Sequence, residues 1–461
     1  MTAEKKTAGS ARPRDLALQA LMDRAGNVSA HLARLIQERH PAPADASLAR
    51  ELAFGVLRRR RTLDKLLDAF MQHKTPPPDR VQNVLRIGAY QLTFLQRVPD
   101  FAAVNEAVGQ ISDRSPGVRG FVNGVLRNLA RSLSEEQTGP PPRRSDVLPM
   151  GPDQFRTLGR AVFAAPTLDP AGYAADAYSL PDDLAKKWVA DWGLAKLAEL
   201  AMHSNARPPV ILRVDTDKIS VADALARLTA SGIRAEPHRN GSSIVIDQPL
   251  DVASVEMFGQ GLISPQDAMA SVVVGAAGLQ PGMRVVDLCS SPGTKTVQMA
   301  QRMHNEGKIV ALDVSAEKLE PVQESCRRCG VSIVETMLAP QAGQLADESW
   351  DLVLVDAPCS NTGVLCRRPE ARWRFTRKQV GDLVNDQRRL IFLASQMVRS
   401  GGTLLYSTCS MEAEENAQVV AHLREREKTF RLVRQEVIWP SGLGDATNWN
   451  DGGFFAILRR S

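Results

Sequence analysis

Four apolar segments in the C-terminal part of the chain constrain the fold most, because each ends in polar residues and precedes a helical pattern. They are RVVDLCSS (284–291), KIVALDVS (308–315), WDLVLVDAPCS (350–360) and GGTLLYSTCS (401–410). Strands that alternate with helices form a parallel, doubly wound sheet with helices on both faces. Ligands of such sheets bind at the carboxyl ends of the strands, so we expect the chemistry at the polar ends of these segments.

The rest of the 461-residue chain follows other patterns. Apolar residues recur every three to four positions from about residue 12 to 133, which predicts an all-α domain at 1–135. Residues 136–173 are rich in proline and charge and predict a linker. Residues 174–260 contain strand, helix and strand patterns of a small α/β module, and 261–461 form the Rossmann-like sheet domain. The predicted fold is therefore multidomain.

Composition narrows the class of protein. Hydrophobic residues at 43% and charged residues at 24% are typical of a soluble globular chain, and the net charge is only +5. No apolar run is long enough for a membrane span or a signal peptide, so we expect a cytoplasmic protein without membrane contact. Six cysteines in a chain this long do not predict a disulfide scaffold. Cys326 and Cys329 have zinc-like spacing but no second pair, so no metal site is predicted.

The loop after the first strand of the sheet predicts a cofactor site. CSSPGTKT (289–296) is neither the GxGxxG of nicotinamide enzymes nor a P-loop, but a Pro-Gly turn at a helix N-terminus still offers free N–H groups to an anion. Asp313 follows Gly293 by about twenty residues, the usual interval to an acid that binds ribose hydroxyls. Together they predict a nucleoside cofactor; the alternative is an ordinary turn and a helix-capping Asp.

Two cysteines stand where later strands end, and each directly precedes a serine. Cys359 and Cys409 are candidate nucleophiles, because a thiolate at such a site can attack a bound ligand. A thiolate that adds to carbon 6 of cytosine makes carbon 5 nucleophilic enough to accept a methyl group. Asp356 precedes Ala-Pro-Cys and is placed to hydrogen-bond the base or the cofactor. The alternative is that both cysteines are small buried apolar side chains.

Five C-terminal motifs and the helical first domain resemble known families. The motifs are DLCSSPGTKT, VDAPCSNTG, RRPEARW, YSTCSMEAEEN and DGGFFAILRR. In this order they resemble the S-adenosylmethionine-dependent RNA 5-methylcytosine methyltransferases of the NOP2/Sun (Fmu) superfamily. FGVLRRRRTLDKLL and FVNGVLRN resemble the NusB-like RNA-binding domain. The combination resembles the RsmB branch, which methylates a cytidine of 16S ribosomal RNA. The small α/β module at 174–260 is predicted to be RRM-like and to recognise RNA.

The resemblance implies a role for each motif residue. Cys409 of Thr-Cys-Ser corresponds to the nucleophile, and Cys359 of Pro-Cys-Ser to the cysteine that assists product release. Asp356 corresponds to the motif acid beside Ala-Pro-Cys, and Asp313 to the ribose-binding acid. The implied S-adenosylmethionine loop consists of Cys289, Ser290, Ser291, Pro292, Gly293, Thr294 and Lys295.

Two positions depart from the family pattern. Thr294 stands where the family usually has a second glycine, and Met337 stands near the position of an Asp beside the cofactor adenine. Glu335 is the neighbouring acid that could replace it. These departures are the support for the main alternative, a NusB-like RNA-binding scaffold without turnover.

Ribosomal RNA is the expected partner, and the protein is expected to act as a monomer. The predicted RNA-contacting residues are the basic run Arg58, Arg59, Arg60 and Arg61, with Arg367 and Arg368 of the RRPEARW motif. The alternative for the basic run is a solvated helix face. Within the superfamily, the alternative substrate is transfer RNA or another ribosomal site.

Overall fold

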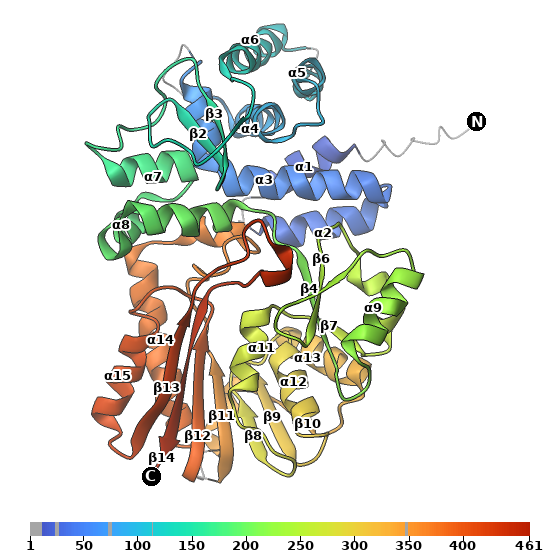
Figure 1. Cartoon of the computed structure of the whole chain (residues 1–461), viewed down its shortest axis with the longest axis vertical. Helices are drawn as coiled ribbons and strands as arrows, with labels where there is room; N and C mark the ends of the chain where they lie inside the picture. The colour runs from blue at the N-terminus through green and yellow to red at the C-terminus, as the bar shows by residue number, and fades with distance from the viewer. Residues whose placement is uncertain (1–11, 24–26, 72–75, 113, 346–348) are drawn as a thin grey trace, which may run out of the picture. The chain divides into compact units, whose positions relative to one another are not determined.

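The computed structural model describes residues 12–23, 27–71, 76–112, 114–345 and 349–461 (Figure 1). The chain forms two compact units. The first comprises Met1–Ala206 with Arg368–Arg374, and the second comprises Arg207–Arg367 with Phe375–Ser461. Each unit has its own buried apolar core and is described by itself.

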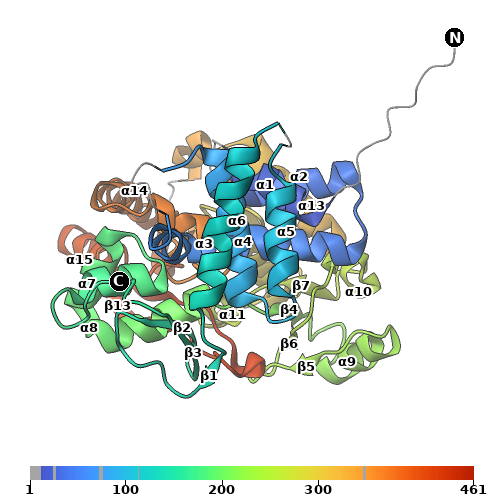
Figure 2. The ribbon, with the colours of Figure 1, turned by 90° about the horizontal axis from the view of Figure 1, so that it is seen from above.

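The first unit opens with six helices, as the helical spacing predicts. They are α1 (Pro13–Leu21), α2 (Val28–Arg39), α3 (Pro43–Asp68), α4 (Asp79–Phe94), α5 (Asp100–Gly109) and α6 (Pro116–Ser132). Helices α4, α5 and α6 lie side by side in Figure 2. The apolar stripe of α3, which includes Leu52, Leu63 and Leu66, is fully buried, and this stripe is what holds the long helix in place.

The segment predicted as a linker carries ordered structure. Strands β1 (Gln137–Thr138), β2 (Val147–Gly151) and β3 (Gln154–Thr157) form a small antiparallel sheet in the order β1-β3-β2. Strands this short, set among prolines, have too few residues to show a period of their own, so the sequence pattern does not reveal them.

Two further helices complete the first unit. They are α7 (Pro170–Tyr178) and α8 (Asp182–Asn205), which bends at Gly193, where φ is +76°. The first unit therefore runs on to Ala206, well beyond the predicted start of the α/β module at residue 174. The predicted domain boundaries thus differ from the division of the chain into compact units.

The second unit begins with the small α/β module. Its strands are β4 (Val210–Val214), β5 (Glu236–Pro237), β6 (Ser243–Ile246) and β7 (Ile263–Pro265). They form an antiparallel sheet in the order β5-β6-β4-β7, and α9 (Val221–Ala230) packs on it. Leu212, Ile244 and Ile246 are buried between the sheet and this helix.

A seven-stranded sheet dominates the second unit, in the order β10-β9-β8-β11-β12-β14-β13 (Figure 1). Its strands are β8 (Arg284–Asp287), β9 (Lys308–Asp313), β10 (Val334–Leu338), β11 (Trp350–Asp356), β12 (Val398–Thr408), β13 (Phe430–Ile438) and β14 (Gly453–Arg460). Strands β8 to β12 pair in parallel, and β14 runs antiparallel to both of its neighbours. The doubly wound prediction is confirmed, with an added antiparallel hairpin at one edge.

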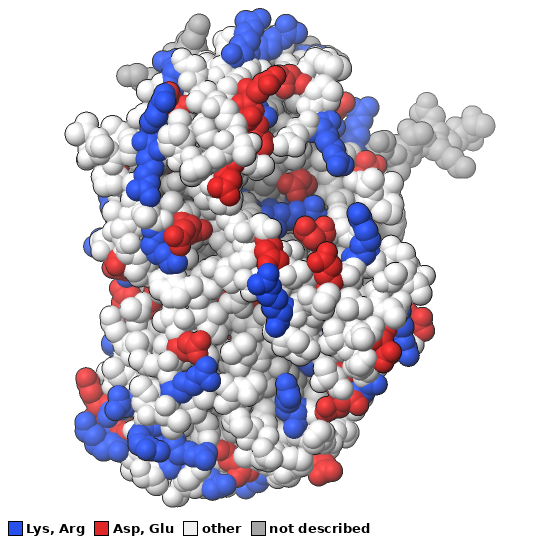
Figure 3. Space-filling model, viewed as in Figure 1, with Lys and Arg blue, Asp and Glu red and all other residues white. Residues whose placement is uncertain are grey.

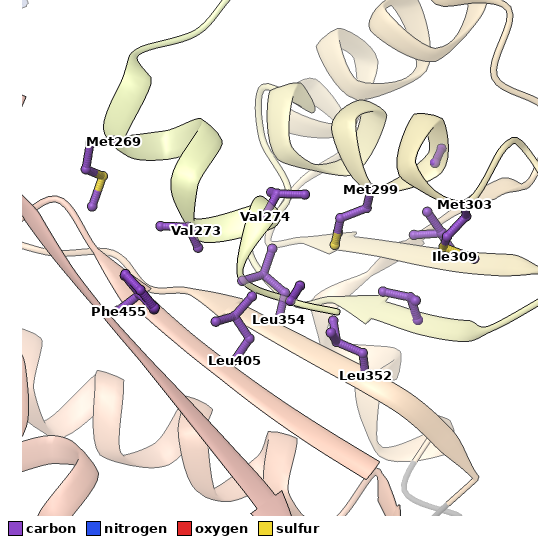
Figure 4. Close-up of a cluster of buried hydrophobic side chains, with 13 residues drawn as sticks. Met269, Val273, Val274, Met299, Met303, Ile309, Leu352, Leu354, Leu405 and Phe455 are labelled. Carbon is purple, nitrogen blue, oxygen red and sulfur yellow. The ribbon is translucent and has the colours of Figure 1, made fainter. Parts of the chain in front are cut away.

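Helices cover both faces of this sheet. On one face, α11 (Ala268–Gly275) and α12 (Thr294–Arg302) pack on alternate residues of β11, among them Leu352 and Leu354 (Figure 4). Helix α14 (Arg377–Ser395) packs against β11 and β12, and α15 (Ala417–Arg426) packs against α14. Because the central parallel strands share one direction, the loops after β8, β9, β11 and β12 all leave at the same edge.

Two predicted absences concern membrane and metal. None of the described helices is long and apolar enough to cross a membrane. Cys326 and Cys329 lie on α13 (Ala316–Cys329), where they are buried against Val322 and Ala311. Among the described residues, no group of three or more His, Cys, Asp or Glu side chains is arranged to hold a metal ion.

Candidate active site

The two cysteines meet because their strands are neighbours. Strands β11 and β12 pair in parallel with Asp356 opposite Ser407, so the loops that follow them leave the sheet together. Cys409 directly follows β12 and Cys359 lies three residues beyond β11, and their Sγ atoms are 3.2 Å apart. At this distance one sulfur donates a hydrogen bond to the other, so the protonation of one thiol depends on that of the other.

The environment of Cys359 favours its neutral thiol. Its hydrogen bond to Cys409, its burial and the nearby negative charge of Glu415 raise the pKa of Cys359 well above the ordinary value. The Cys409 Sγ atom also lies 3.3 Å from Asn361 Oδ1, and Asn361 Nδ2 donates to the carbonyl of Cys359 at 2.7 Å. The raised pKa makes Cys359 the sulfur of the pair that keeps its proton, which it can donate to Cys409.

A partly buried ion pair lies at the end of β11. Lys295 Nζ donates to Asp356 Oδ2 at 2.6 Å, and Ser407 Oγ donates to Asp356 Oδ1 at 2.6 Å. Burial alone would lower the pKa of Lys295, but the Asp356 carboxylate reverses this effect and the pKa is raised. The Cys409 sulfur also raises the pKa of Lys295, so this cation lies within electrostatic reach of the candidate nucleophile.

The predicted cofactor loop wraps around the ends of β8 and β9. Ser290 N and Oγ donate to the carbonyl of Leu312, and Ser291 N donates to Asp313 Oδ2 at 3.1 Å. Gly293 has a φ of +95° and is buried at the start of α12, where an added Cβ would lie 2.9 Å from Val322 Cα. Only glycine fits this turn without strain.

The other members of the loop lie around this turn. Pro292 is exposed, and Thr294 begins α12. Burial raises the pKa of Cys289, so this thiol is held neutral. The sequence-predicted loop and Asp313 are therefore brought together at one edge of the sheet.

Asp287 is a site residue that the sequence analysis missed. It ends β8 and is buried, and its Oδ2 accepts from Thr296 Oγ1 at 2.7 Å. Burial raises the pKa of Asp287 to about 7. Within the described residues its Oδ1 has no hydrogen-bond partner. The signal in the sequence was a single acid that directly follows the two buried valines of the strand.

These residues fit a nucleoside cofactor that also carries a cationic group. The Gly293 turn permits close backbone approach, and Asp313 supplies a carboxylate at the end of β9. The unpartnered oxygen of Asp287 is an acceptor for an ammonium or hydroxyl group.

Met337, which departs from the motif pattern, and Glu335, the neighbouring acid, lie at different places along β10. Met337 lies on β10 beside Leu312, one position before the residue paired with Asp313, so it is at the end of the sheet that carries Asp313. Glu335 pairs with Val310 further back along the strand and forms an exposed ion pair with Lys308 at 2.8 Å. The structure therefore places Met337, and not an acid, on the strand beside Asp313, the predicted ribose-binding residue.

The basic run on α3 points largely into the first unit. Arg58 and Arg59 are each 7% exposed, and Arg59 donates to the carbonyls of Pro149 and Met150 at 3.3 Å. Burial lowers the pKa of Arg59 to about 10, and it does the same to Arg60.

The other two arginines of the run are also engaged within the first unit. The Arg60 guanidinium lies 4.0 Å from the ring centroid of Trp373, and Arg61 forms ion pairs with Asp176 and Asp182. The run is thus no solvated helix face, and RNA contact by these residues stays a prediction.

The arginines of RRPEARW fall in different units. Arg367 belongs to the second unit, where it forms ion pairs with Asp267 at 3.0 Å and with Asp451 at 2.5 Å. Arg368 is exposed and belongs to the first unit. Figure 3 shows acidic and basic side chains interspersed over the visible face. RNA contact by Arg367 and Arg368 is likewise a prediction that the geometry does not test.

Three family models match this chain. A model described as 16S rRNA methyltransferase RsmB/F matches residues 276–449. A NusB family model matches residues 11–131, and a ferredoxin-like domain of RsmF/B-like methyltransferases matches residues 180–253. Their order along the chain is that of the helical domain, the small α/β module and the sheet domain.

Curated relatives and solved structures agree over most of the length. The probable ribosomal RNA small subunit methyltransferase B of Bacillus subtilis is 30% identical over 414 residues, which cover 88% of this chain and 87% of the relative. A protein of the same name from Synechocystis is 31% identical, over 91% of this chain and 90% of the relative. The crystal structure of PH0851 has a TM-score of 0.74 at 22% identity and covers 98% of both chains, which shows a shared fold.

Proposed function

This chain belongs to the ribosomal RNA small subunit methyltransferase B family, which uses S-adenosylmethionine, and on that premise we propose that it methylates carbon 5 of a cytidine in 16S ribosomal RNA through a covalent cysteine–cytosine adduct. The observation that carries the proposal is the contact between Cys359 and Cys409, 3.2 Å apart at the ends of adjacent strands. A cysteine that acts only as a nucleophile does not need a second thiol beside it. A second thiol can help to break the cysteine–cytosine bond after methyl transfer.

Cys409 acts as the nucleophile in this proposal. Its thiolate adds to carbon 6 of the cytosine, and the electron pair of the 5,6 double bond makes carbon 5 nucleophilic. Carbon 5 then accepts a methyl group, which the bound cofactor supplies from its sulfonium centre. A base then takes the proton from carbon 5, and the electron pair of that C–H bond restores the double bond and expels the Cys409 thiolate. The target base must be unstacked for Cys409 to reach carbon 6, so a loop or a flipped nucleotide is required.

Cys359 assists the release step. Its pKa is raised, so it enters the reaction as a neutral thiol beside the Cys409 sulfur. A proton held at this position can be shared with the departing sulfur, which makes Cys409 a better leaving group. Without that group we expect the methylated adduct to persist.

Asp356 and Lys295 orient the base. Their ion pair and the Ser407 hydrogen bond fix the Asp356 carboxylate at the end of β11. A carboxylate only accepts hydrogen bonds, so it suits the 4-amino group of cytosine and not the 4-oxo group of uracil. This gives the site a physical means of choosing cytosine.

The S-adenosylmethionine site consists of Asp313, Asp287 and the loop from Cys289 to Lys295. Asp313 accepts from the ribose hydroxyls, and the unpartnered oxygen of Asp287 accepts from the ammonium group. We further propose a monomer that works in the cytoplasm, with RNA contacts from Arg58 to Arg61, Arg367 and Arg368.

The test compares the wild-type protein with Cys409→Ala and Cys359→Ala. Each is incubated with methyl-labelled S-adenosylmethionine and unmethylated 16S ribosomal RNA, then analysed by denaturing electrophoresis and nucleoside analysis. We expect 5-methylcytidine from the wild type, no product and no adduct from Cys409→Ala, and a persistent protein–RNA band from Cys359→Ala.

Two results would sink the proposal. Turnover by Cys409→Ala would show that Cys409 is not the nucleophile. Normal turnover by Cys359→Ala without an adduct would show that Cys359 does not assist release. Label in transfer RNA but not in 16S ribosomal RNA would change the substrate. Cofactor binding and RNA binding without label in any lane would favour a non-catalytic RNA-binding scaffold.

A further inference from the structure

Glu415 is a buried carboxylate that the proposed reaction does not use. It lies in the loop between β12 and α15 and is 0% exposed. Its oxygens accept four hydrogen bonds, from Ser360 N at 2.9 Å, from Ser360 Oγ, from Ser410 Oγ at 2.5 Å and from Gln387 Nε2 at 3.0 Å. No ion pair to Glu415 occurs in the described part of the chain.

The partners of Glu415 are the residues that follow the two cysteines. Ser360 comes directly after Cys359, and Ser410 comes directly after Cys409. The two Oε atoms of this one carboxylate therefore tie the loop after β11 to the loop after β12. The two serine hydroxyls also contact each other at 3.0 Å, so the bridge closes into a compact network.

The bridging carboxylate is itself held from two other elements. Gln387 on α14 donates from Nε2 both to the carbonyl of Pro358 and to Glu415 Oε1. Tyr406 on β12 donates from its hydroxyl to the main-chain carbonyl of Glu415 at 2.6 Å. Because both its backbone and its side chain are fixed, Glu415 can set the spacing of the two loops.

The charge at this position also matters. Burying a carboxylate without a cation is costly, and an amide of the same size would fill the same space. Its negative charge is one of the causes that raise the pKa of Cys359, after the hydrogen bond to Cys409 and burial. The charge of Glu415 therefore acts on the protonation of Cys359, and its hydrogen bonds fix the residues that follow Cys359 and Cys409.

We propose that Glu415 is a positioning residue, which holds Cys359 and Cys409 in contact through Ser360 and Ser410 and keeps Cys359 as the neutral thiol. The inference rests on the proposed function, because it gives Glu415 a task in the formation and resolution of the cysteine adduct. Glu415 is 0% exposed, so its proposed role does not depend on contact with the substrate. It acts through the geometry of the two thiols.

The first experiment measures adduct formation in the Cys359→Ala protein with and without Glu415→Gln. We expect the added substitution to slow adduct formation at least tenfold, because a displacement of about 1 Å at a reacting group can cost about 10²-fold. Affinities for 16S ribosomal RNA and S-adenosylmethionine should change less than about twofold, since Glu415 touches neither. The matched control is Glu425→Gln, the same change on an exposed position of α15.

The second experiment needs no turnover. The rate at which iodoacetamide alkylates Cys359 is followed by peptide mass spectrometry between pH 6 and 10. We expect the midpoint for Cys359 to move to lower pH in Glu415→Gln and its alkylation at neutral pH to quicken at least about threefold. Glu425→Gln should match the wild type.

The outcomes distinguish a failure of the proposed methylation from a failure of the proposed role of Glu415. If the wild type methylates nothing and Cys359→Ala forms no adduct, the proposed function fails, while the alkylation profiles still decide whether Glu415 acts on Cys359. The positioning role is refuted by two results together. The Cys359→Ala protein forms its adduct equally fast with and without Glu415→Gln, and the pH profile of Cys359 alkylation is the same in the Glu415→Gln single variant as in the wild type. Should Glu415→Gln fail to fold, Ser410→Ala takes its place, because it removes one donor and keeps the carboxylate; unchanged adduct formation in that variant also refutes the role.

Discussion

The ion pair of Lys295 with Asp356 differs from that of Lys308 with Glu335 in burial and hardly in length. The two N–O distances are 2.6 and 2.8 Å, but the side chains are 14% and 32% exposed in the first pair and 44% and 66% in the second. We expect Lys295→Met to lower the free energy of unfolding by about 2 kcal/mol, because it leaves Asp356 partly buried without its cation. Lys308→Met should cost less than about 1 kcal/mol. Urea unfolding of both variants checks this, and equal losses would contradict it.

Asp287 predicts a pH dependence of stability. Its pKa in the folded protein is raised to about 7 by burial, whereas the ordinary pKa of Asp is 3.8. Between these values the folded protein keeps the proton and the unfolded chain loses it, so the contribution of Asp287 is largest at low pH and is lost as pH rises through about 7.

The change that tests this pH dependence is Asp287→Asn. The amide cannot titrate and keeps an acceptor for Thr296. Relative to the wild type, we expect the variant to gain about 2 kcal/mol of unfolding free energy between pH 5 and pH 8. Urea unfolding at both pH values measures the gain. A constant difference between the two proteins would show that Asp287 titrates normally.

At the scale of elements, the turn that joins β8 to α12 depends on a close approach to α13. Gly293 has a φ of +95°, and a Cβ there would lie 2.9 Å from Val322 Cα. Gly282 has a φ of +83°, and a Cβ there would meet nothing within 4 Å. Both positions strain alanine, but only Gly293 also forces two elements apart.

The matched pair Gly293→Ala and Gly282→Ala separates these two effects. We expect Gly282→Ala to cost about 1 kcal/mol of stability and to leave the affinity for S-adenosylmethionine unchanged. Gly293→Ala should cost more stability and weaken cofactor binding at least about tenfold, because the loop from Ser290 to Lys295 must shift. Calorimetric titration and urea unfolding measure both quantities. Equal cofactor affinity in the two variants would show that the loop tolerates the shift.

The sequence was informative where local pattern decides structure. Alternating strands and helices predicted the sheet, and the carboxyl-end rule placed Cys359, Cys409 and Asp313 at one edge of it. The family resemblance supplied the roles of these residues. The local pattern did not show the short strands β1 to β3 or the bridge from Glu415 to Ser360. Both depend on contacts between segments that are distant in the sequence.

At the scale of the whole molecule, the two compact units are not two successive stretches of the sequence. Residues Arg368–Arg374 come between β11 and α14, yet they belong to the first unit. There Arg372 is fully buried and donates to the carbonyls of Arg58, Ser179 and Ser204 and to Asn205 Oδ1. The periodicity of the sequence cannot predict that this segment belongs to the first unit, because seven residues are too few to show which distant residues they contact.

Two units with separate cores should unfold in separable steps. We expect S-adenosylmethionine to shift only the transition of the second unit, by about 2.7 kcal/mol when the free ligand is at 100 times its Kd. Arg372→Lys should shift only the transition of the first unit, by about 3 kcal/mol, because lysine cannot replace the planar set of donors in a buried site. Arg374→Lys, on the exposed neighbour in the same segment, is the control and should shift neither.

Calorimetry of the full chain, with hydrogen exchange to assign each transition, measures these shifts. If one cooperative transition moved with both the ligand and Arg372→Lys, the units would be thermodynamically one domain. The segment Arg368–Arg374 would then be the physical reason, since it enters and leaves the first unit from two points of the second unit's chain and links their unfolding. Separate shifts would instead mean that the sheet domain can bind its cofactor while the helical unit is unfolded.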